Sequence, residues 1–257
     1  MKMPLEKLFS GMNYKKNFFR RLVQIGRTLV SRILAIFGPP LPQVVRTIKA
    51  DKLSYLSQEA LSDIYYSIKE IEQAGIQGTL IEAGCALGGS AIVIATAKSQ
   101  TRPLNVYDVF DMIPPPSDED GSDVHQRYEI IKNGQAKGIG DAKYYGYEKD
   151  LYGVVTNNFR AHNLDLEKNN IQLIKGLFEN VMHLDGPVAF AHIDGDWYSS
   201  ILTCMERIVP QLVPGGRLII DDYDSWTGCR KAVNQYFASR KSQFKFVWKS
   251  ELHIIRK

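Results

Sequence analysis

The sequence has few cysteines and no long apolar run that is free of charge. Cys85, Cys204 and Cys229 lie far apart and form neither a disulfide framework nor a metal-binding pattern, so we expect a reducing compartment. A run of about 18 uncharged apolar residues is absent, which argues against a membrane-spanning helix. The N-terminus also lacks the uninterrupted apolar core of a signal peptide. These absences predict a cytoplasmic protein.

The chain also lacks a strong charge of one sign. Its net charge is +4, but residues 1–40 carry eight Lys or Arg and one acid, Glu6, so the rest of the chain is net acidic. That acidic part contains no basic groove with interleaved aromatic residues, and nucleic acid is therefore not an expected partner. The length of 257 residues suits one large α/β domain with an extension.

The extension is a basic N-terminal arm, expected over residues 1–50, before a single domain over residues 51–257. Residues 20–37 place apolar side chains on one half of a helix and basic or polar ones on the other, and a Gly-Pro-Pro run ends this helix. Such a helix can lie peripherally on an anionic membrane, or it can pack on its own domain or on a second subunit. Because an apolar face needs a cover, we expect a homo-oligomer.

The body of the chain alternates apolar runs of strand length with helical patterns. The expected strands are 79–83, 104–109, 171–175, 188–193 and 217–220, and the expected helices are 57–74, 88–97, 197–213 and 227–239, with 43–55 irregular. The last two short runs, 244–248 and 252–255, predict a closing hairpin. A mostly parallel α/β sheet that ends in an antiparallel hairpin is typical of the Rossmann-like class I methyltransferase fold.

One segment, about residues 110–170, does not fit this alternation. It contains three consecutive prolines, an acidic turn at residues 118–121 and several tyrosines, with helical pieces expected near 123–133 and 152–163. Loops of this length in compact domains usually serve as lids or binding loops. We therefore expect the insertion to be a lid that covers the substrate.

Four aspartates follow two neighbouring predicted strands. Asp194 and Asp196 come directly after strand 188–193, and Asp221 and Asp222 come directly after strand 217–220. Open α/β sheets place their ligands at the carboxyl ends of the strands. Four carboxylates this close repel one another, and a divalent cation such as Mg²⁺ resolves that conflict. The alternative is that single members, Asp196 in particular, cap the helices that follow.

A glycine turn after the first strand predicts the cofactor side of the site. The strand runs through Glu82 into Gly84, and Ser90 lies at the start of the next helix. Glycines at such a turn let the backbone approach a ligand, and the helix N-terminus offers free N–H groups to a carboxylate. Asp108 closes the second strand, where an acid can bind both hydroxyls of a ribose. S-adenosylmethionine suits this arrangement, with its ribose at Asp108 and its amino-acid end at the glycine turn and Ser90.

The motifs together resemble the macrocin O-methyltransferase family over roughly residues 50–240. The segments that carry the resemblance are Ile81-Glu82-Ala83-Gly84, Gly88-Gly89-Ser90, Asp108 with Phe110, His192-Ile193-Asp194-Gly195-Asp196-Trp197-Tyr198, Gly215-Gly216 and Asp221-Asp222-Tyr223. The resemblance implies an enzyme that depends on S-adenosylmethionine and magnesium. It implies that Asp194, Asp221 and Asp222 are the metal ligands and that Asp196 is the general base. It also implies that Glu82, Gly84, Ser90 and Asp108 bind the cofactor.

The sequence departs from the family pattern where lid and substrate meet. Ala86-Leu87 replaces the usual Trp-Arg pair, and residues 111–116 differ from the usual Gly-Leu-Pro. These departures bear on the acceptor more than on the chemistry. The expected activity is methylation of a hydroxyl on a sugar or a glycosylated natural product, with a small glycoside or diol as acceptor and with Asp196, or a lid residue such as His125, as base. His192, just before the metal cluster, is expected to be a supporting residue.

Three other functions remain open from the residues alone. A catechol-type acceptor offers the same pair of adjacent hydroxyls, and the tyrosines of the insertion would stack on a catechol or on a sugar. A metal-dependent nucleotide-sugar glycosyltransferase would use Asp194 and Asp196 as its metal motif. A non-catalytic protein that binds S-adenosylmethionine would show cofactor binding without turnover that depends on magnesium.

Overall fold

The computed structural model describes residues 39–257, and residues 42–257 form one compact unit. The amphipathic helix predicted over residues 20–37, with its membrane or subunit contact, lies outside the described residues. Within them, no helix is both long enough and apolar enough to cross a membrane.

Seven strands of the described residues form one sheet, in the order β3-β2-β1-β4-β5-β7-β6. Their bounds are β1 Thr79–Ala83, β2 Leu104–Asp108, β3 Ile171–Lys175, β4 Val188–Ile193, β5 Leu212–Ile220, β6 Phe244–Trp248 and β7 Leu252–Arg256. The first five strands are parallel, and β7 pairs antiparallel with both β5 and β6. The predicted parallel sheet with a closing antiparallel hairpin is therefore confirmed.

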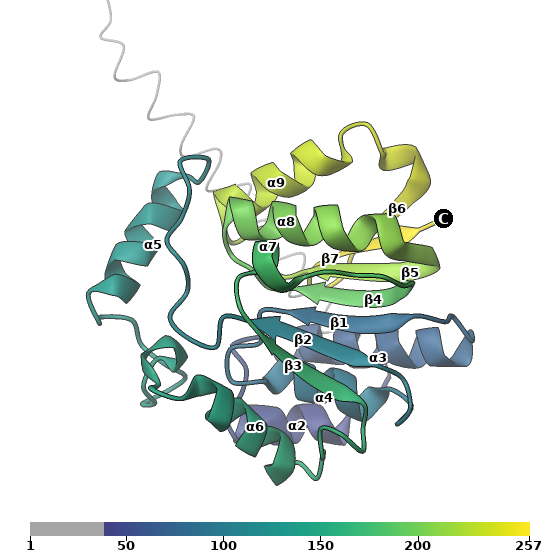
Figure 1. The fold of residues 1–257 in the computed structure, drawn as a ribbon, viewed down its shortest axis with the longest axis horizontal. Coiled ribbons are helices and arrows are strands. Elements are labelled where there is room, and N and C mark those ends of the chain that lie inside the picture. The colour runs from purple at the N-terminus through teal and green to yellow at the C-terminus, as the bar shows by residue number, and fades with distance from the viewer. Residues whose placement is uncertain (1–38) are drawn as a thin grey trace, which may run out of the picture. The chain divides into compact units, whose positions relative to one another are not determined.

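Helices cover both faces of this sheet (Figure 1). One face carries α2 (Gln43–Ala50), α3 (Gln58–Gln73), α4 (Gly89–Ala97) and α6 (Leu151–Ala161), and the other carries α7 (Phe178–Val181), α8 (Tyr198–Ile208) and α9 (Thr227–Phe237). The helix α5 (Ser122–Lys132) stands outside both layers. The predicted insertion therefore consists of two parts. Its second part contains α6, which packs in the helical layer on one face of the sheet. Its first part, residues 110–150, lies outside both helical layers, and we call it the lid.

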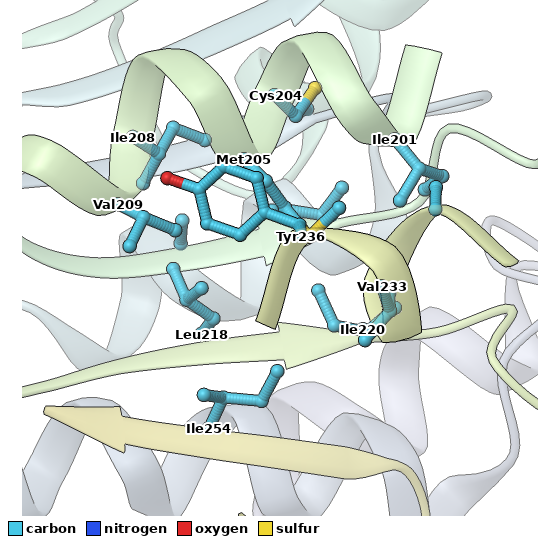
Figure 2. Close-up of a cluster of buried hydrophobic side chains, with 14 of the residues drawn as sticks. Ile201, Cys204, Met205, Ile208, Val209, Leu218, Ile220, Val233, Tyr236 and Ile254 are labelled. Atoms are coloured by element: carbon cyan, nitrogen blue, oxygen red, sulfur yellow. The ribbon is translucent and has the colours of Figure 1, made fainter. Parts of the chain in front are cut away.

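The larger core fills the space between the sheet and α8 with α9 (Figure 2). Ile201 and Ile208 of α8 meet Leu218 and Ile220 of β5, and Tyr236 of α9 lies among them. Full burial of each such aliphatic side chain stabilises the fold by about 1.5–3 kcal/mol. This packing fixes the helices that begin beside the carboxyl ends of β4 and β5.

On the opposite face, α4 is buried on nearly all sides, as the unbroken apolar run Ala91–Ala95 indicates. It lies between α2 and α3 on one side and α6 on the other, since a side chain at Gly88 would contact Val155 and Phe159 of α6. The glycine turn before α4 is therefore held by a rigid element.

The bounds of two predicted elements and the character of a third segment are wrong. The helix expected over residues 197–213 ends at Ile208, because Pro210 has no backbone N–H to continue the α-helical hydrogen bonds, and a short 3-10 turn follows over Val209–Gln211. The strand β5 consequently begins at Leu212, five residues before the predicted start. Residues 43–50, expected to be irregular, form α2, which buries Val45 and Ile48. The β-branched residues of this short segment hide its helical spacing.

Candidate functional site

The site lies at the carboxyl ends of β1, β2, β4 and β5. The residue that follows β1, β4 or β5 still donates its backbone N–H to the neighbouring strand. This hydrogen bond fixes the residue in place. The N–H of Gly84 donates to the carbonyl of Tyr107 at 2.8 Å, that of Asp194 to Ala83 at 2.8 Å, and that of Asp221 to Ile193 at 3.1 Å. The two predicted acidic clusters are therefore neighbours in space.

Asp194, Asp221 and Asp222 together form a cluster that could hold a metal ion. One carboxylate oxygen from each lies within 4.8 Å of those of the other two. Asp194 and Asp222 are close enough for their carboxyls to hydrogen-bond to each other. Burial, and then the charge of the neighbouring aspartates, raises the pKa of both well above its usual range. Among residues 39–257 none of the three carboxylates forms a salt bridge. Burial raises the pKa of Asp221, although the charge of His192 partly offsets this rise. Three carboxylate donors suit Mg²⁺.

Asp196 lies next to this trio in an uncommon backbone conformation, with a φ of 54°. Its N–H donates to Oδ2 of Asp222 at 3.2 Å, and its own Oδ1 accepts the indole N–H of Trp226 at 2.9 Å. Burial raises the pKa of Asp196 to about 6, although the Trp226 hydrogen bond acts in the opposite direction. Within the described part of the chain, Oδ2 of Asp196 accepts no hydrogen bond.

A cavity separates this acidic cluster from Asp108. About 590 Å³ of space there is not filled by atoms, a volume that includes open solvent. Its lining includes Gly84, Cys85, Ala86, Asp108, Ile113, Pro114, Tyr145, Phe178, Asp194 and Asp196. The cavity is therefore lined both by Asp108, the predicted ribose-binding acid, and by Asp196 and Asp194, the predicted base and one predicted metal ligand.

The Asp108 carboxylate also fixes two turns. Its Oδ2 accepts the N–H of Cys85 and its Oδ1 accepts the N–H of Phe110, both at 2.7 Å. Burial raises its pKa, while the hydrogen bond from Cys85 lowers it. Each oxygen keeps a second lone pair, so the carboxylate can still accept bonds from ribose hydroxyls.

Gly84 is required by a close approach of the chain to itself. Its φ is +86°, and a Cβ at this position would lie 1.9 Å from the carbonyl oxygen of Asp194. The sequence predicts that a glycine here lets a ligand come near. In the structure, the absent side chain lets the glycine turn lie directly against Asp194, and Gly84 also lines the cavity.

Glu82 and Ser90, both predicted cofactor residues, lie beneath the cavity and do not line it. The carboxylate of Glu82 is fully buried and accepts the Ser90 hydroxyl on one oxygen and Nδ1 of His192, at 3.1 Å, on the other. Burial lowers the pKa of His192, but the Glu82 carboxylate outweighs it and the pKa rises to about 9. The pair stabilises the base of the glycine turn, and His192 has a supporting position.

The acidic turn of the lid caps two helices, a role that the sequence analysis missed. The N-cap residues of α8 and α9, Trp197 and Trp226, make no side-chain cap. Oδ1 of Asp120 accepts the N–H of Tyr198 at 2.8 Å, and Oδ2 of Asp123 accepts the N–H of Thr227 at 3.0 Å. The only signal in the sequence was an Asp-rich turn, which carries no information about its distant partners.

Tyrosines from the lid cover the mouth of the cavity. Tyr145 lines it and packs on Tyr144, with ring centroids 4.5 Å apart. Burial raises the pKa of Tyr144 to about 12, so this hydroxyl stays protonated. The guanidinium of Arg127 lies 5.9 Å from the Tyr144 ring centroid. His125, the alternative base, is exposed on α5 and does not line the cavity.

Comparisons with known proteins agree with this geometry. Residues 51–247 match the family described as Macrocin-O-methyltransferase (TylF). The chain is 28% identical over 207 residues to the 8-demethyl-8-(2,3-dimethoxy-alpha-L-rhamnosyl)-tetracenomycin-C 4'-O-methyltransferase of Streptomyces olivaceus, covering 78% of this chain and 71% of that protein. It is 24% identical to the mycinamicin III 3''-O-methyltransferase of Micromonospora griseorubida, covering 77% and 73%. The fold matches the O-methyltransferase NovP with a TM-score of 0.66 at 20% identity, over 80% of this chain and 82% of that one.

Proposed function

Because the chain belongs to the macrocin O-methyltransferase family, we propose that it transfers a methyl group from S-adenosylmethionine to a hydroxyl of a sugar or a glycosylated natural product. The observation that carries this proposal is that one cavity is lined by Asp108, by Asp196 and by Asp194, which belongs to the three-carboxylate cluster. The names of the two relatives support the acceptor class, since both describe O-methylation of a glycosylated compound.

The residues present suit both groups that this chemistry needs. Asp194, Asp221 and Asp222 would hold Mg²⁺, and Asp108 with the backbone of the glycine turn would hold S-adenosylmethionine. When bound, S-adenosylmethionine supplies an electrophilic methyl group, and Mg²⁺ supplies positive charge that favours loss of the acceptor's hydroxyl proton. The predicted roles of Glu82 and Ser90 become indirect in this proposal, because both support the turn from beneath.

Asp196 would accept that proton. Its Oδ1 is held by Trp226, and its Oδ2 has no protein donor among residues 39–257. With a pKa of about 6, the carboxylate is mostly ionised at neutral pH and can act as a general base there. Its place in the cavity wall puts it within reach of an acceptor bound there.

The lid would exclude water and orient the acceptor. Ile113, Pro114 and Tyr145 line the cavity from the lid side. An apolar and aromatic cover suits the ring face of a sugar or of an aglycone. A catechol-type diol would fit the same wall, whereas the family assignment argues against a glycosyltransferase and against a non-catalytic protein.

The test has two stages. Calorimetric titration with S-adenosylmethionine should show binding, and Asp108→Asn should weaken it at least tenfold. Methyl transfer from labelled S-adenosylmethionine should then be measured on a panel of glycosides and on a catechol, with and without Mg²⁺. Turnover of a glycoside that requires Mg²⁺ is the expected result. Turnover of the catechol alone would contradict the acceptor class, and a failure to bind S-adenosylmethionine would contradict the proposed cofactor.

A further inference from the structure

The side chain of Trp226 contacts the proposed base directly. Its indole Nε1 donates to Oδ1 of Asp196 at 2.9 Å. Trp226 is the N-cap residue of α9 and lies 30 residues from Asp196 in the sequence. We propose that Trp226 is a positioning residue for the base, and that the lid fixes Trp226 through Asp123. This inference rests on the proposed role of Asp196.

Asp196 needs such a partner because its surroundings repel it. Burial and then the charge of Asp221 raise its pKa, against the Trp226 hydrogen bond and the charge of Arg127. The backbone N–H of Asp196 bonds to the Asp222 carboxylate. A carboxylate among like charges rotates away from them unless a donor holds it. The indole N–H is a neutral donor that is fixed in a rigid ring, so it selects one orientation of the carboxylate. Because it binds only Oδ1, it leaves Oδ2 for the proton of the acceptor.

Trp226 is itself held from three sides. Its backbone N–H donates to the carbonyl of Asp222 at 3.1 Å, which ties it to the metal-binding turn. Its ring packs against Trp197 with centroids 5.7 Å apart and an interplanar angle of 72°. The next residue, Thr227, donates its N–H to Asp123 at 3.0 Å and its hydroxyl to the same carboxylate at 2.5 Å.

The third of these interactions, between Thr227 and Asp123, involves the lid. Asp123 lies in the first turn of α5, and it supplies the side-chain cap that α9 does not provide for itself. The lid backbone approaches α9 closely here, since a Cβ at Gly121 would lie 2.2 Å from Oγ1 of Thr227. Trp197 also enters the small apolar core of the lid, beside Val124 and Tyr144, and its Nε1 donates to the carbonyl of Pro114 at 2.9 Å. The position of the base therefore depends on the lid being docked.

The central variant is Trp226→Phe, which keeps an aromatic ring and removes the N–H. We expect kcat to fall by about tenfold to a hundredfold, as for other losses of a supporting hydrogen bond, while KM for the acceptor and Kd for S-adenosylmethionine change less than about twofold. Trp197→Phe is the graded comparison, because it removes an indole hydrogen bond of the same length that holds the lid at Pro114 and does not reach Asp196. It should lower kcat only through the docking of the lid, and therefore by less than Trp226→Phe does.

A double-mutant cycle separates positioning from simple packing. If Trp226 acts through Asp196, the variant that combines Trp226→Phe with Asp196→Asn should be no slower than Asp196→Asn alone. Additive losses of kcat would mean that Trp226 only packs, as would wild-type kcat in Trp226→Phe. Wild-type kcat in Asp196→Asn would instead refute the base assignment of the proposed function, so the two failures can be distinguished.

Asp123→Ala tests the lid tie without changing any residue of the cavity. We expect a smaller loss of kcat, about threefold to tenfold, that is not additive with Trp226→Phe. An Asp123→Ala enzyme with wild-type kcat would refute the role of the lid, even if the Trp226 result held.

Discussion

Two buried acidic groups of this protein differ in how their charge is balanced. In strand β1, Glu82 is fully buried and is paired with His192 and Ser90. At the carboxyl edge, Asp194, Asp221 and Asp222 lie within 4.8 Å of one another, and among the described residues none of them forms a salt bridge. Burial raises the pKa of Asp221, although the charge of His192 partly offsets this rise. The first group has one positive partner for one carboxylate, whereas the three carboxylates of the second outnumber the positive charge near them. A balanced buried charge indicates a structural role, whereas an unbalanced cluster marks the functional site.

The largest expected effect comes from neutralising one member of the unbalanced cluster. Asp221→Asn should reduce kcat about a thousandfold, because a metal ligand is lost while the shape is kept. The unfolding free energy should not fall, since one repelling charge is removed. Methyl-transfer assays and urea denaturation check the two halves of this prediction. If Asp221→Asn clearly lost stability and kept its activity, the aspartate cluster would have a structural role and not a functional one.

The balanced pair should show the opposite pattern. Glu82→Ala leaves a buried His192 without its partner and should lower the unfolding free energy by about 3–5 kcal/mol. Any folded fraction should keep measurable affinity for S-adenosylmethionine, because the side chain does not line the cavity. Chemical denaturation and calorimetry would test this. If stability stayed at the wild-type value while cofactor binding was abolished, Glu82 would be a cofactor ligand, as the sequence first predicts.

Magnesium should raise the free energy of unfolding through the aspartate cluster and not through the Glu82–His192 pair. At about a hundred times its Kd, the ion should add about 2.7 kcal/mol to the stability of the wild type. Asp194→Asn should show much less of this increase, and His192→Gln should show all of it. Thermal denaturation with and without Mg²⁺ is sufficient. An equal rise of Tm in wild type and Asp194→Asn would place the ion elsewhere.

The smallest expected effect concerns pH. The pKa of His192 is about 9 in the folded protein and about 6.5 when unfolded, so its contribution is complete below about pH 6.5 and is lost as the pH rises through 9. About 2 kcal/mol should disappear between pH 7 and pH 9. Urea denaturation across this range should show the fall in wild type and a flatter profile in His192→Gln. Equal slopes in the two proteins would mean that His192 is neutral in the fold.

Short-range sequence patterns were sufficient to predict much of this molecule. Apolar runs located β1, β3 and β4 to the residue, and the acids that follow β4 and β5 predicted the cluster because parallel strands end at one edge. The helix predicted over residues 57–74 agrees with α3 and its N-cap Ser57, whose hydroxyl accepts the N–H of Ala60 at 3.0 Å. Each of these inferences needs only neighbouring residues.

What the sequence could not show are contacts between distant segments. The hydrogen bond from Tyr198 to Asp120 spans 78 residues, and that from Thr227 to Asp123 spans 104. The same limit applies to Glu82, whose pairing with His192 joins residues 110 positions apart and is not visible in the local motif. Whether a side chain at a strand end points into the cavity or into the core depends on the face of the sheet on which it lies. The motif alone does not say which face that is.

The most direct test of this account is a calorimetric titration of Mg²⁺ into the protein, in the presence of S-adenosylhomocysteine, for wild type and Asp221→Asn. We expect one ion to bind per wild-type chain and at least a hundredfold weaker binding by the variant. Equal binding by both proteins, or none by the wild type, would contradict the claim that the unbalanced cluster is the metal centre of this methyltransferase.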